Sequence, residues 1–270
     1  KNIQSALYVP DEQHIELIQA VKPDIKDRIA HNELEMETIL GLKHQHQQLT
    51  IGRLIYGIEK FKKTMHPKYK AIFSALAKNQ QPHTLFITCC DSRIDPNLIT
   101  STQPGELFIM RNIGNMIPVF GNDQTPSEGA AIEYAIGVLN VKQIIICAHS
   151  ECGAINQILS GEIFNSTNQK RLPSVVKWLS MLKEIKVHFS GDITSEEAAK
   201  INASSQLENL KTYPIVQEKL ASGSLQLKAL YYDIGKSDVE IWDEVLGQYI
   251  SISGTDPLVM FGANQITQWK

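Results

Sequence analysis

The sequence predicts an α/β fold, a mostly parallel sheet flanked by helices and preceded by an N-terminal helical arm. Two apolar, β-branched runs, residues 84–89 and 143–148, end abruptly in cysteine, aspartate or histidine, as buried parallel strands do. Strand and helix patterns alternate over about seventy residues, which favours a parallel sheet with right-handed crossovers. Together these observations predict side chains with chemical capability at the carboxyl ends of the strands.

The composition is that of an ordinary globular protein. The 270 residues are 43% hydrophobic and 20% charged, with a formal net charge of −3. This balance indicates no nucleic-acid partner. No apolar run reaches the ~18 residues that a membrane-spanning helix needs, so we expect no membrane insertion by this chain. Four cysteines are too few for a disulfide scaffold, which favours a reducing, cytoplasmic compartment.

Residues 1–50 are polar and weakly patterned, and we interpret them as an arm or linker before a domain over residues 51–270. A helix is expected over residues 33–48. His44 and His46 stand two positions apart, so they point to different sides of that helix and indicate a solvent face rather than a metal site. From residue 51 an apolar stripe with helical spacing needs a cover. It consists of Ile51, Leu54, Ile55, Ile58 and Phe61.

The later elements follow from turn and helix-capping signals. Pro96 begins a short helix, and Thr125 to Glu128 reads as a capping box with Pro126 in the first turn. Strands are expected over residues 85–89, 106–111, 144–148 and 225–234. Helices are expected over residues 69–77, 153–159, 173–185 and 195–220, the last interrupted at Pro214, and the residues from 250 onward are interpreted as loop.

Five side chains at the ends of the first and third strands could carry chemistry. They are Cys89, Asp91, Arg93, His149 and Cys152. Because ligands of an open parallel sheet lie outside the carboxyl ends of its strands, we expect these side chains to converge. Two thiolates and an imidazole form a zinc ligand set, and three protein ligands leave a fourth position open for water, as in catalytic sites. Zinc would bring that water to a pKa of roughly 7.

Asp91 has two alternative roles beside such a metal. It can accept a hydrogen bond from the bound hydroxide, or it can replace the water as a fourth ligand. Arg93 can pair with Asp91 and hold it away from the metal. Taken singly, each of these residues is as readily a core or turn residue, and Cys90 and Cys147 are interpreted as small hydrophobic side chains. The conjunction of the five carries the metal hypothesis.

The motifs CCDSR and HSEC resemble the CxDxR and HxxC signatures of the β-class carbonic anhydrases. The segments RNIGN, SEGAAIEYAIGVLNVKQIIICAHSECGA, and SQLENLKTYPIV followed by LKALYYDI are similar to that family's motifs in the same order, over about residues 51–242. The resemblance implies Zn²⁺ bound by Cys89, His149 and Cys152, with Asp91 as the alternative fourth ligand. It makes Asp91 and Arg93 a dyad beside the metal.

The resemblance also implies an extra edge strand and a homodimer or homotetramer in which N-terminal helices embrace the neighbour. Two positions depart from the family. Ala148 stands where a glycine is usual before the ligand histidine, and Cys90 replaces a common serine. The chain begins at Lys1 rather than Met. Family architectures that place this domain after a membrane anion transporter leave open that it is cut from a longer chain.

The sequence therefore predicts a zinc-dependent carbonic anhydrase, a lyase that hydrates carbon dioxide reversibly to bicarbonate and a proton through attack by zinc-bound hydroxide. Two alternatives stay open. One is hydrolysis of carbonyl sulfide or carbon disulfide by the same hydroxide. The other is a weakly catalytic zinc-binding module associated with anion transport, for which Ala148 is the motive.

Overall fold

A computed structural model describes residues 50–122, 126–182 and 193–253 of the chain. The helix predicted over residues 33–48, its two histidines and the capping residue Thr125 lie outside the described residues. Contacts divide the chain into two compact units, Lys1–Asn79 and Gln80–Lys270. The division between an arm and a domain at residue 50 stays a prediction.

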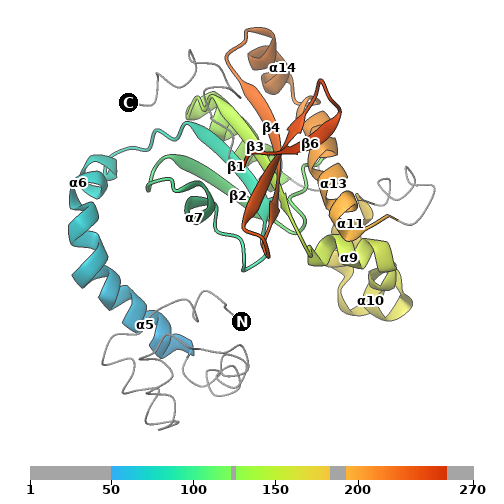
Figure 1. Cartoon of the computed structure of the whole chain (residues 1–270), viewed down its shortest axis with the longest axis horizontal. Helices are drawn as coiled ribbons and strands as arrows, with labels where there is room; N and C mark the ends of the chain where they lie inside the picture. The colour runs from blue at the N-terminus through green and yellow to red at the C-terminus, as the bar shows by residue number, and fades with distance from the viewer. Residues whose placement is uncertain (1–49, 123–125, 183–192, 254–270) are drawn as a thin grey trace. The chain divides into compact units, whose positions relative to one another are not determined.

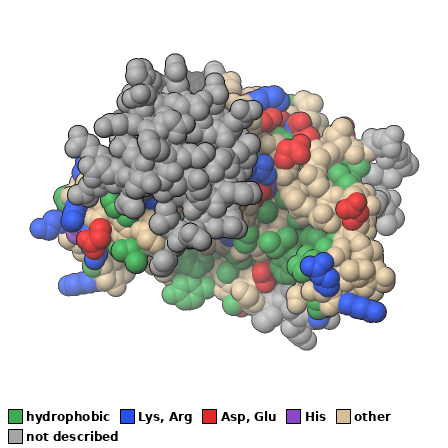
Figure 2. Space-filling model, turned by 90° about the horizontal axis from the view of Figure 1, so that it is seen from below, with side chains coloured by type: hydrophobic (Ala, Val, Ile, Leu, Met, Phe, Trp, Pro, Cys, Tyr) green, Lys and Arg blue, Asp and Glu red, His purple; other side chains and the backbone are tan. Residues whose placement is uncertain are grey.

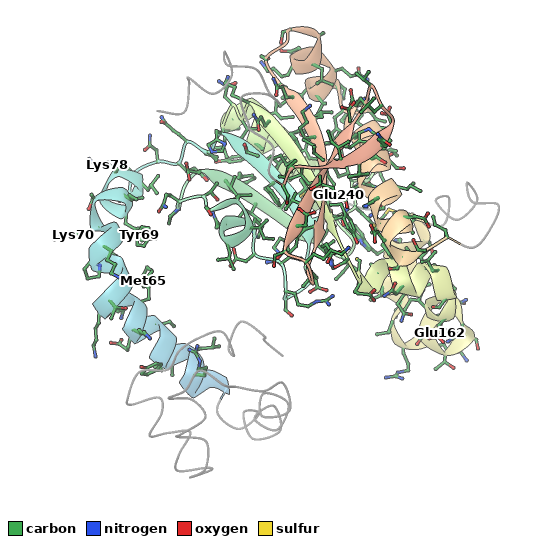
Figure 3. The ribbon with its side chains drawn as sticks, viewed as in Figure 1. Met65, Tyr69, Lys70, Lys78, Glu162 and Glu240 are labelled. Atoms are coloured by element: carbon green, nitrogen blue, oxygen red, sulfur yellow. The ribbon has the colours of Figure 1, made fainter. Side chains whose placement is uncertain are left out.

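The described part of the first unit is a continuous helical stretch. It comprises α5 (Thr50–Lys60), the π-helical segment η2 (Phe61–Met65) and α6 (His66–Leu76), and Figure 3 labels Met65, Tyr69 and Lys70 along it. The predicted apolar stripe is open to solvent, since Leu54, Ile55 and Ile58 are each more than half exposed. The rings of Phe61 and Phe73 meet edge to face, 5.9 Å apart. This helical face has no cover within the described part of its own unit.

The second unit is built on one six-stranded sheet in the order β2–β1–β3–β4–β5–β6 (Figure 1). The strands are β1 (Thr84–Cys89), β2 (Leu107–Asn112), β3 (Gln143–His149), β4 (Gln226–Asp233), β5 (Asp238–Asp243) and β6 (Gln248–Ser251). The first four strands pair in parallel, and β5 and β6 add antiparallel to β4. The structure confirms the predicted mostly parallel sheet with an added edge.

The central strands explain the apolar runs in the sequence. Every residue of β1 is buried, and β3 is buried except at two half-buried positions. A strand enclosed in this way has no polar face, so its sequence is continuously apolar. Thr88 is the polar exception, and its hydroxyl donates to the carbonyl oxygen of Cys147 over 2.8 Å. The register pairs Thr88 with Cys147, so β1 and β3 end at the same edge of the sheet.

Helices connect and flank these strands. They are α7 (Pro96–Thr100), α8 (Pro126–Glu133), the π-helical η3 (Tyr134–Val138), α9 (Gly153–Ser160), the 3-10 turn η4 (Glu162–Phe164), α10 (Ser166–Arg171), α11 (Pro173–Ser180), α13 (Ser195–Leu210) and α14 (Pro214–Ala221). Figure 1 shows α13 running along the sheet, where it contacts β3 and β4. The predicted interruption at Pro214 is the boundary before α14. Among the described residues, every helix is too short or too polar to cross a lipid bilayer.

Candidate metal centre

The structure brings the three predicted ligands together. The sulfur atoms of Cys89 and Cys152 and a ring nitrogen of His149 all lie within 4.8 Å of one another, and all three residues are buried. Cys89 ends β1 and His149 ends β3, while Cys152 follows a turn in which Glu151 has a φ of 52°. Zinc bonds of about 2.0–2.3 Å in a tetrahedron separate ligand atoms by roughly 3.5–4 Å, so this cluster fits a zinc ion with small adjustments.

The hydrogen bonding of His149 leaves one ring nitrogen for a metal. Nδ1 lies 2.8 Å from the carbonyl oxygen of Ser150, and because a carbonyl can only accept, Nδ1 carries the proton. The other nitrogen, Nε2, is buried without a hydrogen-bond partner. A buried polar atom without a partner is destabilising. A zinc ion bound at Nε2 would remove that deficiency, so the residues present fit the metal.

The two cysteines are coupled. The Cys152 thiol donates a hydrogen bond to the Cys89 sulfur, and this bond is the main cause that lowers the pKa of Cys89 to about 4, with help from His149 and the backbone N–H of Gly114. The same hydrogen bond and burial raise the pKa of Cys152, while two backbone N–H groups in the first turn of α9 favour its thiolate. Thiolates are the form that binds zinc.

Asp91 and Arg93 form an ion pair beside the three ligands. The Arg93 guanidinium donates to both carboxylate oxygens over 2.9 and 2.8 Å, and its backbone N–H donates to Oδ1 over 2.9 Å. These hydrogen bonds lower the pKa of Asp91 to about 2. Oδ2 of Asp91 lies 4.0 Å from Nε2 of His149. Arg93 also donates to the carbonyl oxygen of Glu151 over 3.0 Å, which joins the turns after β1 and β3.

Arg111 and Asn112 at the end of β2 support the turn after β1, a role that the sequence did not reveal. The Arg111 guanidinium donates to the carbonyl oxygens of Cys89 and Asp91 over 3.0 and 2.7 Å. The Asn112 side chain donates to the Met116 carbonyl and accepts from its N–H, both over 2.7 Å. The RNIGN motif was the signal, since it places a cation and an amide at a strand end.

The remaining cysteines and Ala148 have separate environments. Cys147 is fully buried in β3, and burial raises its pKa to about 12, which agrees with its interpretation as a small hydrophobic side chain. The same interpretation of Cys90 is wrong, because Cys90 stands past the end of β1 and is exposed. Ala148 is buried in β3 and pairs with Tyr231 in regular register.

Comparison with known proteins agrees with this geometry. The sequence profile of a family described as "Carbonic anhydrase" matches residues 84–239. A carbonic anhydrase of Synechococcus elongatus is 42% identical over 194 residues, which cover 69% of this chain and 70% of that protein. The solved β-carbonic anhydrase CcaA is 38% identical and superposes with a TM-score of 0.69, over 75% of this chain and 99% of CcaA.

A further solved relative bears on assembly. One of two tetrameric β-carbonic anhydrases of Sordaria macrospora is 28% identical and superposes with a TM-score of 0.57, over 77% of this chain and 99% of that chain. The profile covers more than half of the chain, and the Synechococcus relative exceeds 30% identity over more than two thirds of it. The chain therefore belongs to the β-carbonic anhydrase family, and it is an enzyme of the carbonic anhydrase class.

Proposed function

We propose that the chain hydrates carbon dioxide reversibly to bicarbonate and a proton at a zinc ion held by Cys89, His149 and Cys152. The observation that carries the proposal is the buried Nε2 of His149, which has no hydrogen-bond partner and lies within 4.8 Å of two cysteine sulfurs. The family to which the chain belongs supports the reaction, and the donor set of two sulfurs and one nitrogen supports zinc.

Zinc, when bound, supplies a Lewis acid that makes water a nucleophile near neutral pH. Asp91 accepts a hydrogen bond from that nucleophile and turns its lone pair toward carbon dioxide. With a pKa of about 2, Asp91 does not retain a proton at pH 7, so the proton released by hydration passes on to solvent and buffer. Arg93 holds the Asp91 carboxylate in this orientation through its two-point pair.

The fourth zinc position belongs to water rather than to Asp91 in this proposal. Both carboxylate oxygens of Asp91 already accept from Arg93, and Oδ2 lies 4.0 Å from the ligand nitrogen of His149. Direct binding of Asp91 would break at least one of these charge-assisted hydrogen bonds, which are about twice as strong as neutral ones. The ion pair therefore supports an open site.

A homodimer or homotetramer is proposed for the assembly, and exposed apolar surface supports it. Figure 2 shows hydrophobic side chains open on the surface of the molecule. In the second unit Ile109 on the edge strand β2 is exposed, and so are Tyr134 and Val138 on η3. An edge strand with exposed apolar side chains favours pairing with another chain. The tetrameric Sordaria relatives point the same way. A cytoplasmic location is proposed because all four cysteines are free thiols.

One experiment tests the proposal and separates it from the two alternatives. Stopped-flow hydration of carbon dioxide is measured on protein whose zinc content is known, with Cys152→Ser and the exposed, adjacent-to-ligand Cys90→Ser as a matched pair. We expect stoichiometric zinc and fast hydration in the wild type and in Cys90→Ser, and loss of both in Cys152→Ser.

Other outcomes contradict it in distinct ways. Slow hydration together with sulfide release from carbonyl sulfide would favour the hydrolase, and full zinc without hydration would favour the weakly catalytic module. If Cys152→Ser kept stoichiometric zinc and the full hydration rate, the ligand assignment itself would be wrong.

A further inference from the structure

Three amide side chains lie on one face of α13, at spacings of four and three residues: Asn202, Gln206 and Asn209. Asn202 is 0% exposed and Gln206 is 3% exposed, among buried alanines and leucines of the same helix. Burying an amide is unfavourable unless its donor and acceptor groups are paired. Their placement on an otherwise apolar face therefore indicates that they bind specific polar groups.

Those groups belong to the backbone of residues 113–117, the loop that follows β2. Asn202 donates to the carbonyl oxygen of Gly114 over 2.9 Å, and Gln206 accepts from the N–H of Ile117 over 2.7 Å. Asn209 donates to the carbonyl oxygen of Ile117 over 2.7 Å, and Gln206 donates to Asn202 over 3.0 Å, which orients it. The loop has left the sheet, so no strand can pair these groups.

A second side chain holds the other side of Gly114. The indole N–H of Trp178 in α11 donates to the carbonyl oxygen of Ile113 over 2.8 Å. That carbonyl and the N–H of Gly114 belong to the same planar trans peptide group, in which they point in opposite directions. The N–H of Gly114 donates to the sulfur of Cys89. Trp178 therefore fixes the orientation of the donor that Cys89 receives.

Gly114 needs such restraint because its own backbone does not provide it. Its φ is +80°, and glycine moves between conformations more freely than any other residue. The helix that carries Asn202 is itself anchored to the sheet. Lys200, two residues earlier, pairs with Glu240 of β5 over 2.8 Å, and the Tyr249 hydroxyl of β6 donates to the Lys200 carbonyl over 2.8 Å. Figure 3 labels Glu240 in this position.

We propose that Trp178 and Asn202 are positioning residues of the metal centre, which hold the two peptide groups around Gly114 so that its N–H stays directed at the Cys89 sulfur. The inference rests on the zinc site proposed above. A merely structural role for both residues would change stability alone. A positioning role changes zinc affinity and the electronic state of the sulfur as well, because groups that orient a metal ligand influence the metal through it.

The test compares Trp178→Phe, which removes the N–H and keeps an aromatic ring, and Asn202→Leu, which removes the donor, with Tyr213→Phe. Tyr213 is the matched control because its hydroxyl donates to the carbonyl of Pro118, further along the same loop, over 2.9 Å. Zinc affinity is measured on the full chain by competition with a chromophoric chelator. The sulfur-to-metal charge-transfer band is measured after substitution with Co²⁺.

We expect the zinc dissociation constant to rise about tenfold in Trp178→Phe and in Asn202→Leu. The cobalt band should move to lower energy in both, because a thiolate that loses a hydrogen bond gives up electron density more readily. Tyr213→Phe should keep the wild-type affinity and band.

Wild-type affinity and an unshifted band in folded Trp178→Phe overturn the proposal, and so does an equal loss in Tyr213→Phe. If Asn202→Leu does not fold, Trp178→Phe decides alone, since it keeps most of the indole's apolar contact. Failure of the zinc site itself is distinct, because the wild-type chain would then bind no zinc or Cys152→Ser would bind it equally well.

Discussion

Oδ2 of Asp91 lies 2.8 Å from the Arg93 guanidinium and 4.0 Å from Nε2 of His149. The first distance is a strong charge-assisted hydrogen bond, and the second is too long for any hydrogen bond. The carboxylate therefore faces its arginine rather than the ligand histidine. Because Arg93 also binds the Glu151 carbonyl, the pair fixes the turn after β1 against the turn after β3.

Replacing Asp91 should separate catalysis from metal binding. We expect Asp91→Asn to keep stoichiometric zinc and to lose about 10²–10⁴-fold in kcat/KM, the range that a positioned proton acceptor contributes. The amide keeps the shape of the side chain but lacks the charge and one acceptor. Metal analysis and stopped-flow hydration on the same sample measure both quantities.

The matched control for this change is Asp95→Asn. The Asp95 side chain caps α7 by accepting from the N–H of Leu98 over 3.2 Å, and asparagine caps a helix about as well as aspartate. Asp95→Asn should therefore keep the wild-type rate. Unchanged turnover in Asp91→Asn would show that the carboxylate has no role in the reaction.

The ion pair should also make stability depend on pH. Arg93 holds the pKa of Asp91 at about 2, below its ordinary 3.8, so the stabilisation is complete above pH 4 and disappears as the pH falls toward 2. The Arg93 side chain is 34% exposed, so solvent screens the pair and we expect Arg93→Gln to lower the free energy of unfolding at pH 7 by about 1 kcal/mol. The difference should shrink below pH 4.

Urea denaturation at pH 7 and pH 3, with a chelator present in both, measures this difference without a contribution from zinc loss. Arg171→Gln is the control, because Arg171 is exposed at the end of α10 and has no ion-pair partner among those found in the described chain. A deficit of Arg93→Gln that is as large at pH 3 as at pH 7 would mean that the Asp91 charge does not cause it.

The backbone at Gly114 should tolerate no side chain. Gly114 and Gly121 both have a φ of +80°, but a Cβ on Gly114 would lie 3.2 Å from the Cβ of Ala154, whereas a Cβ on Gly121 would meet nothing within 4 Å. We expect Gly121→Ala to lower the free energy of unfolding by about 1 kcal/mol from backbone strain alone. Gly114→Ala should lose about 2–3 kcal/mol, since it adds crowding against α9. Equal losses in thermal or urea denaturation would contradict the crowding.

The sequence predicted the ligands because their positions follow from local pattern. Cys89 and His149 each end a continuously apolar run, and the carboxyl ends of parallel strands meet at one edge. Cys152 follows three residues later. No long-range information was needed to bring these three side chains together.

Other features depend on contacts that no local pattern encodes. Trp178 and Asn202 reach the loop after β2 across 65 and 88 residues of sequence. The β5–β6 hairpin was not predicted, because its strands carry charges such as Glu240 that a strand pattern disfavours, and Lys200 of α13 neutralises that charge. One signal was present, since Asn202 and Gln206 are polar on an otherwise apolar helix face.

Ala148 shows how a departure from the family pattern can be accommodated. It lies within the regular β3 ladder opposite Tyr231, and its φ is not among the positive values found in the chain, so the position does not require glycine. We therefore expect Ala148→Gly to leave zinc affinity and hydration rate unchanged and to lower the free energy of unfolding by about 1 kcal/mol, because glycine weakens a strand interior. Chelator competition, stopped-flow hydration and urea denaturation measure these effects. A marked gain in rate with glycine would instead show that the methyl group displaces the imidazole of His149, and it would revive the weakly catalytic alternative.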